Sequence, residues 1–232
     1  MRVFRPANVA CTSTLLLVIL ISLVLLLALS LLVVLNIALP GDALLLQAAM
    51  SLRTPLLTAF LSVPAFLASA APALCLCVAL SFVEWRRVRH TPVKSLATTL
   101  RIVSWPTCAF VIAFIINVIM RTAIGRMPPQ VDYLPQYLPE FQAFFQKYSF
   151  PSGHASSALV AYGSLALVAH KYPRFRWIGY VVAFLVIATI AFDRPYLGVH
   201  WPSDVIAGFL LGMLSVSLSL YLCRRSFDSS IA

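Results

Sequence analysis

Long apolar runs separated by short polar stretches dominate the hydropathy pattern of this chain. A helix that crosses the hydrocarbon core of a bilayer needs about 20 apolar residues, and six segments come close to that length. They lie at roughly 13–39, 55–83, 99–120, 152–170, 176–194 and 203–223. The pattern therefore predicts an all-α fold, a six-span transmembrane helical bundle that forms one membrane domain over residues 1–232.

The composition agrees with a bilayer environment. The chain is 61% hydrophobic and 10% charged, whereas charged residues make up about a quarter of a typical soluble protein. No charge occurs from Pro6 to Gly41. This run is longer than the roughly 7–15 residues of a signal-peptide core, which predicts an uncleaved first span. The net charge of +10 does not make nucleic acid an expected partner, because basic residues beside apolar spans usually set the topology.

The lysines and arginines predict which loops face the cytoplasm. If the six segments cross in turn, twelve of these residues fall on one side and five on the other. Positive charge is retained on the cytoplasmic side, so we expect both termini there. The five on the extracytoplasmic side are Arg53, Arg121, Arg126, Lys147 and Arg194. Three of them close spans, near two histidines and two aspartates, and ionisable groups at membrane depth indicate function.

The cysteines carry no chemical signal. They are Cys11, Cys75, Cys77, Cys108 and Cys223, all in or beside apolar segments. None is spaced with a His or Asp as a metal ligand, and no carboxylate cluster suggests a divalent ion. We therefore expect no disulfide, no metal and no cofactor.

One motif combines a helix start with a histidine. In FPSGHASS, Pro151 suits the first turn of a helix. Ser152 and Gly153 offer a hydroxyl and backbone N–H groups at a helix N-terminus, which attracts anions. His154 belongs to the same turn. The alternative is a helix start whose interfacial histidine has no further role.

A second motif, DRPYLGVHWPSDVIAG, places His200 and Asp204 four residues apart. On a helix they share a face. The carboxylate can then accept the imidazole N–H and leave the other ring nitrogen free as a nucleophile. Arg194 precedes them, and its planar guanidinium suits a pair of phosphate oxygens. The alternative for Asp204 is an ordinary first-turn carboxylate that favours the helix dipole.

The third motif, MRTAIGRMPP, ends the third segment with Arg121 and Arg126. Taken alone, such a pair is more often two interfacial cations that extend toward lipid head groups. Together the three motifs predict one phosphate site. One histidine would attack phosphorus, and the other would protonate the leaving oxygen and then activate water. Arginines and backbone N–H groups would neutralise the phosphate oxygens.

At these residues the sequence resembles the type 2 phosphatidic acid phosphatase family, related to bacterial acid phosphatases and vanadium haloperoxidases. The family motifs are K-x6-R-P, P-S-G-H and S-R-x5-H-x3-D. The second is complete here, and the third matches at its Arg, His and Asp, over a motif region of about 117–210. The resemblance implies that His200 is the nucleophile, Asp204 its orienting partner and His154 the general acid. The expected phosphate ligands are Arg194, Ser152 and Gly153 by resemblance, and Arg121 and Arg126 by charge.

Two positions depart from the family motifs. Arg121 stands at the Lys of the first motif and Pro128 at its Arg, with Arg126 two residues earlier as the nearest cation. Asp193 stands where the third motif has Ser. An acid beside a phosphate site is repulsive unless it turns away or is protonated. Weakened activity, a shifted substrate and a degenerate, non-catalytic lipid-phosphate binder therefore remain open.

The resemblance also implies a substrate class and a location. The substrate would be a lipid phosphate such as phosphatidic acid, phosphatidylglycerophosphate, undecaprenyl diphosphate or a lipid A phosphate. It would be hydrolysed without metal, through a phosphohistidine, at the extracytoplasmic face of a bacterial inner (plasma) membrane. A lipid phosphotransferase with the same site is the alternative. In LPEFQAFFQKY, aromatic residues at helical spacing predict a surface helix over about 141–148, either beside the site or only as an anchor. Protein partners are not predicted.

Overall fold

The computed structural model describes residues 12–37, 39, 41–89, 99, 103–129 and 147–231. Over these residues the chain is helical and contains no strand, which confirms the all-α prediction. The eight helices are α1 (Thr12–Val34), α2 (Asp42–Ser51), α3 (Pro55–Leu67), α4 (Ala70–Val88), α6 (Trp105–Ile124), α8 (Gly153–His170), α9 (Arg176–Tyr196) and α10 (Pro202–Ile231). The expected surface helix at 141–148 lies, except for its last two residues, outside the described residues.

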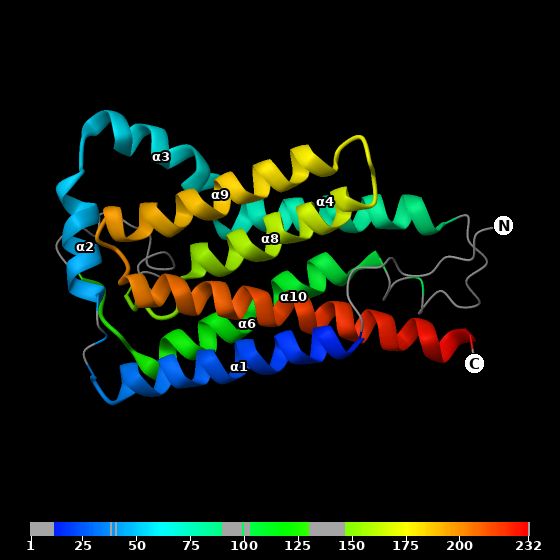
Figure 1. Ribbon diagram of the computed structural model, residues 1–232, viewed down its shortest axis with the longest axis horizontal. Coiled ribbons are helices and arrows are strands. Elements are labelled where there is room, and N and C mark those ends of the chain that lie inside the picture. Colours follow the sequence, from blue (N-terminus) through cyan, green and yellow to red (C-terminus); the bar gives the residue numbers. More distant parts are fainter. Residues whose placement is uncertain are drawn as a thin grey trace.

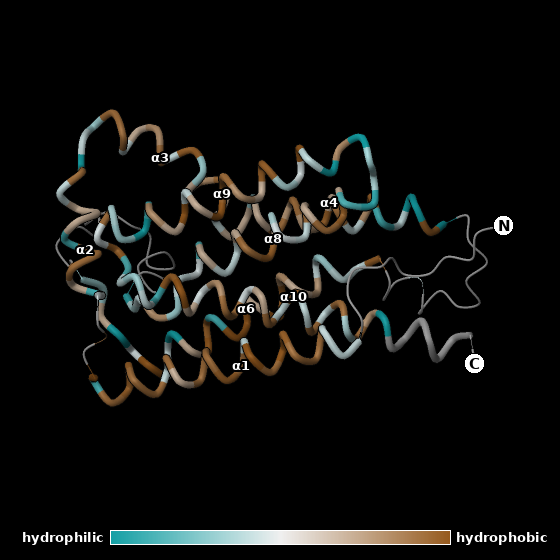
Figure 2. Tube along the Cα trace, viewed as in Figure 1, coloured by the Kyte–Doolittle hydropathy of each residue, from teal (hydrophilic) through white to brown (hydrophobic). Residues whose placement is uncertain are grey.

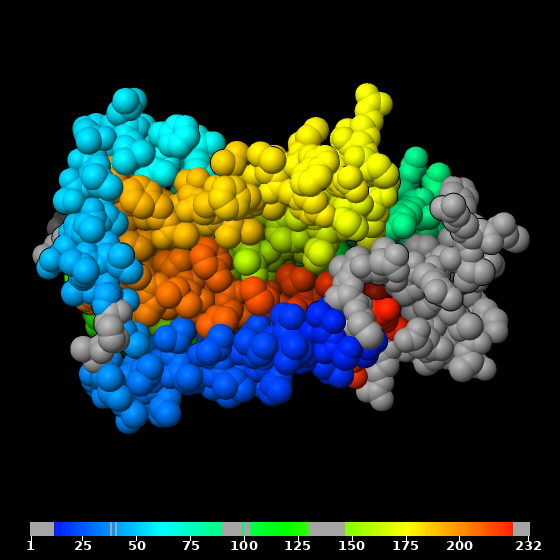
Figure 3. Space-filling view, in the orientation of Figure 1, coloured from blue at the N-terminus to red at the C-terminus, as the bar shows by residue number. Residues whose placement is uncertain are grey.

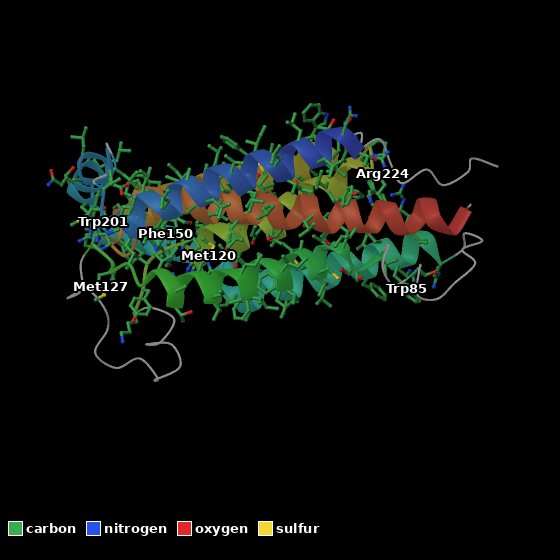
Figure 4. The ribbon with its side chains drawn as sticks, turned by 90° about the horizontal axis from the view of Figure 1, so that it is seen from below. Trp85, Met120, Met127, Phe150, Trp201 and Arg224 are labelled. Carbon is green, nitrogen blue, oxygen red and sulfur yellow. The ribbon has the colours of Figure 1, made fainter. Side chains whose placement is uncertain are left out.

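The long helices lie side by side in a bundle (Figure 1). α8 is central and packs against α4, α6, α9 and α10, while α1 lies against α10. α6 and α9 finish, and α8 and α10 begin, at the same end of the bundle (Figure 1). We call this the motif end, because the three sequence motifs meet there. Trp201, Met127 and Phe150 lie at the motif end, and Trp85 and Arg224 lie at the opposite end (Figure 4).

The prediction of six spans is not confirmed as such. Four helices, α1, α6, α9 and α10, are long and apolar enough to cross a membrane, and the pair α2 and α3, bent by 117°, makes a possible fifth span. The expected segment 55–83 is divided, since α3 ends at Leu67 and α4 begins at Ala70. Pro72 has no N–H to donate to the Ala68 carbonyl, so a continuous helix is disfavoured there. The chain is an integral membrane protein, and its described residues form fewer uninterrupted helices of spanning length than the sequence suggested.

α8 matches the predicted segment 152–170 to within one residue. Its buried positions are mostly Ala and Ser, because its neighbours are helices and small residues let helices approach closely. Gly208 of α10 shows how close this approach is. A Cβ there would lie 2.5 Å from the carbonyl oxygen of Ser152 and 2.8 Å from the Cβ of Ala155. The glycine thus lets α10 lie directly against the start of α8.

Two helices outside this core differ in direction. α1 follows the bundle axis and consists mostly of hydrophobic residues (Figure 2), and apolar side chains such as Leu20 and Leu27 are exposed. α2 instead lies across the motif end (Figure 1) and covers it between α1 and α9 in the space-filling view (Figure 3). It contacts α9 and α10. Hydropathy did not predict α2, because ten residues are too few for a span.

Candidate active site

His200 and Asp204 come together at the start of α10. Asp204 lies in the first turn of the helix, whereas His200 lies two residues before it, in the loop from α9. The Nδ1 of His200 is 3.6 Å from the Oδ2 of Asp204, somewhat longer than a hydrogen bond. Nδ1 has no hydrogen-bond partner among the described residues. The expected pairing is therefore present, but the loop brings it about and not a shared helix face.

The surroundings of His200 favour the neutral ring. The side chain is buried, and this burial lowers the pKa of His200 below its ordinary value of 6.5. Asp204 acts in the opposite direction, while the charges of Arg121 and Arg194 lower the pKa further. A neutral imidazole at neutral pH is the form that a nucleophile requires.

The backbone of Asp204 also holds the start of α8. The Ser152 N–H donates to the Asp204 carbonyl oxygen at 2.9 Å. The Ser152 hydroxyl caps α8 by accepting from the Ala155 N–H at 3.5 Å. Ser152 is buried, and Gly153 and His154 form the first turn of the helix. The N-terminus of α8, with its partial positive charge, is thus fixed beside the His200–Asp204 pair.

His154 lies within this group of charges. The side chains of Arg194, His200 and Arg121 are all close enough to act on its charge. His154 keeps part of its surface exposed, whereas His200 is 5% exposed. Four of the predicted site residues, from α6, α8, α9 and the loop before α10, therefore share one site.

Arg121 is joined at the site by a residue that sequence analysis missed. The Nε of Arg121 and the Nδ2 of Asn117 each donate to the Pro151 carbonyl oxygen at 3.1 Å. Asn117 is buried and lies one turn before Arg121 on α6. It is the one polar residue in the otherwise apolar run 109–120, and this was the signal that could have identified it.

Arg126 is held by carboxylates. Its Nη1 donates to Asp204 Oδ1 at 2.6 Å and to the Ser203 hydroxyl at 2.7 Å. Its Nη2 donates to Asp42 Oδ2 at 2.9 Å, and its guanidinium lies over the ring of Trp201. From the sequence, Arg126 was expected to bind phosphate, and no role was predicted for Asp42. In the structure the contacts of its Nη1 and Nη2 are instead with protein acceptors.

Arg194 has a different partner. Its Nε donates to Asp193 Oδ2 at 2.8 Å, and its Nη2 donates to the same oxygen. Both side chains are buried. Asp193 therefore does not turn away from the expected phosphate ligand, but forms an ion pair with it. Pro128, at the other departure from the family motifs, is buried beside Met127, whose carbonyl oxygen accepts from the Trp201 indole at 3.2 Å.

The part of the chain that carries the three motifs matches a known protein family. Residues 103–228 match the family model of the PAP2 superfamily. An undecaprenyl-diphosphatase of Sulfolobus acidocaldarius is 39% identical over 105 residues, 45% of this chain and 47% of that protein. Phosphatidylglycerophosphatase B of Bacillus subtilis is 30% identical over 121 residues, 50% of this chain and 53% of that protein. The chain thus spans about half the length of these curated relatives.

A solved structure extends the likeness beyond the matched region. The transmembrane PAP2 type phosphatidylglycerolphosphate phosphatase from Bacillus subtilis is 23% identical, with a TM-score of 0.61. The match covers 90% of this chain and 96% of that chain, so the fold is shared over nearly the whole length. Because the family model accounts for more than half of the residues, this chain belongs to the PAP2 superfamily.

Proposed function

We propose that the chain is a membrane lipid phosphatase that removes phosphate from a phosphomonoester or diphosphate through a phosphohistidine on His200. The observation that carries the proposal is the His200–Asp204 pair, buried beside His154 and the N-terminus of α8. Binding alone would not require an oriented, neutral imidazole next to a second histidine. The names of relatives, including a lipid A 1-phosphatase of Rhizobium etli, support lipid phosphates as the substrate class.

The proposed reaction has two steps. The Nε2 of His200 attacks phosphorus, and a P–N bond forms as the P–O bond to the lipid breaks. The leaving oxygen takes a proton from His154. Water then attacks the phosphohistidine, giving a proton back to His154, and the P–N bond breaks to release inorganic phosphate.

The remaining residues have supporting roles in this proposal. Arg194, Arg121 and the first turn of α8, with Ser152 and Gly153, neutralise the phosphate oxygens. Asp204 Oδ2 lies 3.6 Å from Nδ1 of His200. In the substrate complex this contact shortens to a hydrogen bond, in which Asp204 accepts the Nδ1–H and so leaves Nε2 unprotonated for attack. No step requires a metal ion.

We also propose a topology for this single membrane domain. The chain would pass the bilayer six times, with α3 and α4 sharing one passage and α8 enclosed by the others. The excess of Lys and Arg beside the opposite end of the bundle supports a cytoplasmic location for that end. The motif end would then face outward, on the extracytoplasmic side of a bacterial inner membrane, at the depth of lipid head groups.

The test is phosphate release by purified protein in detergent with EDTA. The panel holds dioleoyl phosphatidic acid, phosphatidylglycerophosphate, undecaprenyl diphosphate and lipid A. We expect wild type to release phosphate and His200→Ala to lose at least about 10³-fold in rate, because the nucleophile is gone. His170→Ala is the matched control, since His170 ends the same helix that His154 begins, and we expect it to match wild type.

Two outcomes would contradict the proposal. If phosphate passes to an added acceptor lipid and not to water, the chain is a phosphotransferase. If no lipid loses phosphate while lipid phosphates still bind equally to wild type and His200→Ala, the chain is a binder. Rapid denaturation with labelled substrate should also trap a phosphoprotein that is stable in alkali and lost in acid.

A further inference from the structure

Asp42, the first residue of α2, is buried against the start of α10. It is 7% exposed. Its Oδ1 accepts the Ser203 N–H at 2.9 Å, and its Oδ2 accepts the Ser203 hydroxyl at 2.5 Å. Oδ2 also accepts Nη2 of Arg126 at 2.9 Å. A carboxylate from outside the family-matched region 103–228 therefore reaches the residue next to Asp204.

Arg126 joins this carboxylate to Asp204. One guanidinium lies between Asp42 at 2.9 Å and Asp204 at 2.6 Å. Two buried carboxylates that contact the same guanidinium would repel each other if that cation did not lie between them. The Asp42 network, which consists of Asp42, Arg126, Ser203 and Asp204, thus places a cation between the two carboxylates.

The two oxygens of Asp204 have separate partners. Oδ1 accepts from Arg126, and Oδ2 accepts the Trp201 N–H at 2.9 Å while facing Nδ1 of His200. Rotation of the carboxylate would break the contacts of both oxygens. The orientation in which Oδ2 faces His200 therefore depends on Arg126, and Arg126 is in turn fixed by Asp42.

A second set of contacts links the other end of α2 to the same loop. The Nε of Arg53 donates to the Tyr196 carbonyl oxygen at 2.6 Å. The Thr54 N–H donates to the Tyr196 hydroxyl at 3.0 Å, and Tyr196 is fully buried. The two ends of α2 thus bind the two flanks of the loop that carries His200.

We propose that Asp42 and Arg126 are positioning residues, which orient Asp204 so that it can act on His200. The inference rests on the proposed phosphatase function. It makes α2 part of the active site and not only a connection between spans. Arg126 acts through Asp204 and does not bind the substrate phosphate.

The experiment measures kcat and KM for dioleoyl phosphatidic acid and the inhibition constant of inorganic phosphate. The proteins are wild type, Asp42→Asn, Arg126→Gln and the double variant. His200→Ala, Arg194→Ala and Ser51→Ala are included, the last a control at the exposed end of α2. We expect kcat to fall about 10-fold to 100-fold in each single variant, as for other residues that orient a catalytic group. KM and the phosphate inhibition constant should change by less than about threefold.

A coupled pair gives non-additive effects. We therefore expect the kcat of the double variant to resemble that of Arg126→Gln alone. The midpoint of thermal unfolding in detergent should fall in Arg126→Gln, because two buried carboxylates lose their cation, so kcat is compared per folded protein. A merely structural role would lower the unfolding midpoint and the yield of folded protein while leaving kcat of the folded fraction unchanged, and this would overturn the inference.

Three further results separate the inference from the function on which it rests. If Arg126→Gln raises the phosphate inhibition constant as much as Arg194→Ala does, Arg126 is a phosphate ligand and the inference is wrong. If Asp42→Asn matches wild type while His200→Ala is inactive, only the inference fails. If wild type itself releases no phosphate, the proposed function fails and the inference fails with it.

Discussion

Two arginines at the motif end are paired with aspartates, Arg126 with two and Arg194 with one, and the two pairings differ in how they are anchored. Arg126 reaches Asp204 and Asp42, which belong to different helices, with two separate nitrogens. Arg194 directs two nitrogens to a single oxygen of Asp193, its neighbour in sequence. The other oxygen of Asp193, Oδ1, has no hydrogen-bond partner in the part of the chain that the structure describes.

The difference indicates which arginine can exchange its partner for a phosphate. Moving Arg126 would leave two buried carboxylates without their cation, which typically costs about 3–5 kcal/mol for a buried pair. Moving Arg194 from Asp193 to a phosphate replaces one anion by another. We infer that the Arg126 pair maintains the geometry of the site, whereas the Arg194 pair opens when substrate binds.

The largest expected effect comes from Asp204, the partner of Arg126 that faces His200. Asp204→Asn should lower kcat by about 10³-fold to 10⁴-fold, because an amide no longer fixes the tautomer of its histidine. The measurement is the steady-state rate of phosphate release from dioleoyl phosphatidic acid. Glu84→Gln is the control, since Glu84 forms a buried ion pair with Lys171, 2.7 Å long, outside the motif end. A variant of Asp204 that keeps a tenth of wild-type kcat would refute its role.

The next effect comes from the arginine of the second pair. Arg194→Ala should lower kcat/KM by about 10²-fold to 10³-fold, as the loss of a charge-stabilising donor does elsewhere. It should also weaken inhibition by inorganic phosphate. Arg194→Lys should recover only part of the loss, because an ammonium group lacks the planar fork. An unchanged phosphate inhibition constant would mean that Arg194 is not a ligand.

Several features of the site were predictable from the sequence, whereas the partners of Arg126 were not. Spacing and helix signals predicted α8 and α9 to within two residues and brought His154, Arg194 and His200 into one site. The helix boundaries and the His200–Asp204 spacing depend on residues near one another in the chain. Because successive spans run in opposite directions, the three motifs were expected at one end of the bundle.

The missing features depend on distant contacts. Asp42 and Ser203 are 161 residues apart, and no periodic pattern connects them. The partner of Arg126 could not be predicted either, because a long side chain beside several acceptors is placed by tertiary packing. The break between α3 and α4 was missed for a local reason, since hydropathy alone does not register the N–H that Pro72 lacks.

The third prediction concerns the pH dependence of kcat/KM, which Arg194→Ala and Asp204→Asn should shift in opposite directions. Burial lowers the pKa of His200, so the neutral nucleophile persists below pH 6.5 and activity is lost as the pH falls through that lowered pKa. Arg194→Ala removes a cation that lowers the pKa, so the acid limb of kcat/KM should move to higher pH. Asp204→Asn removes an anion that raises it, so the limb should move to lower pH. Comparing variants on one substrate cancels the ionisation of the phosphate itself.

The smallest expected effect is a lower KM, produced by replacing Asp193. Asp193 and the substrate phosphate compete for Arg194, and Asp193→Ser restores the residue found in the family motif. Removing the competing anion should lower KM for dioleoyl phosphatidic acid by roughly threefold to tenfold, the effect of about 1 kcal/mol, with kcat within about twofold of wild type. Asp193→Asn, which keeps the shape and removes the charge, should change KM in the same direction. A higher KM in both variants would show that Asp193 orients Arg194 for the phosphate, and the two pairs would then have the same role.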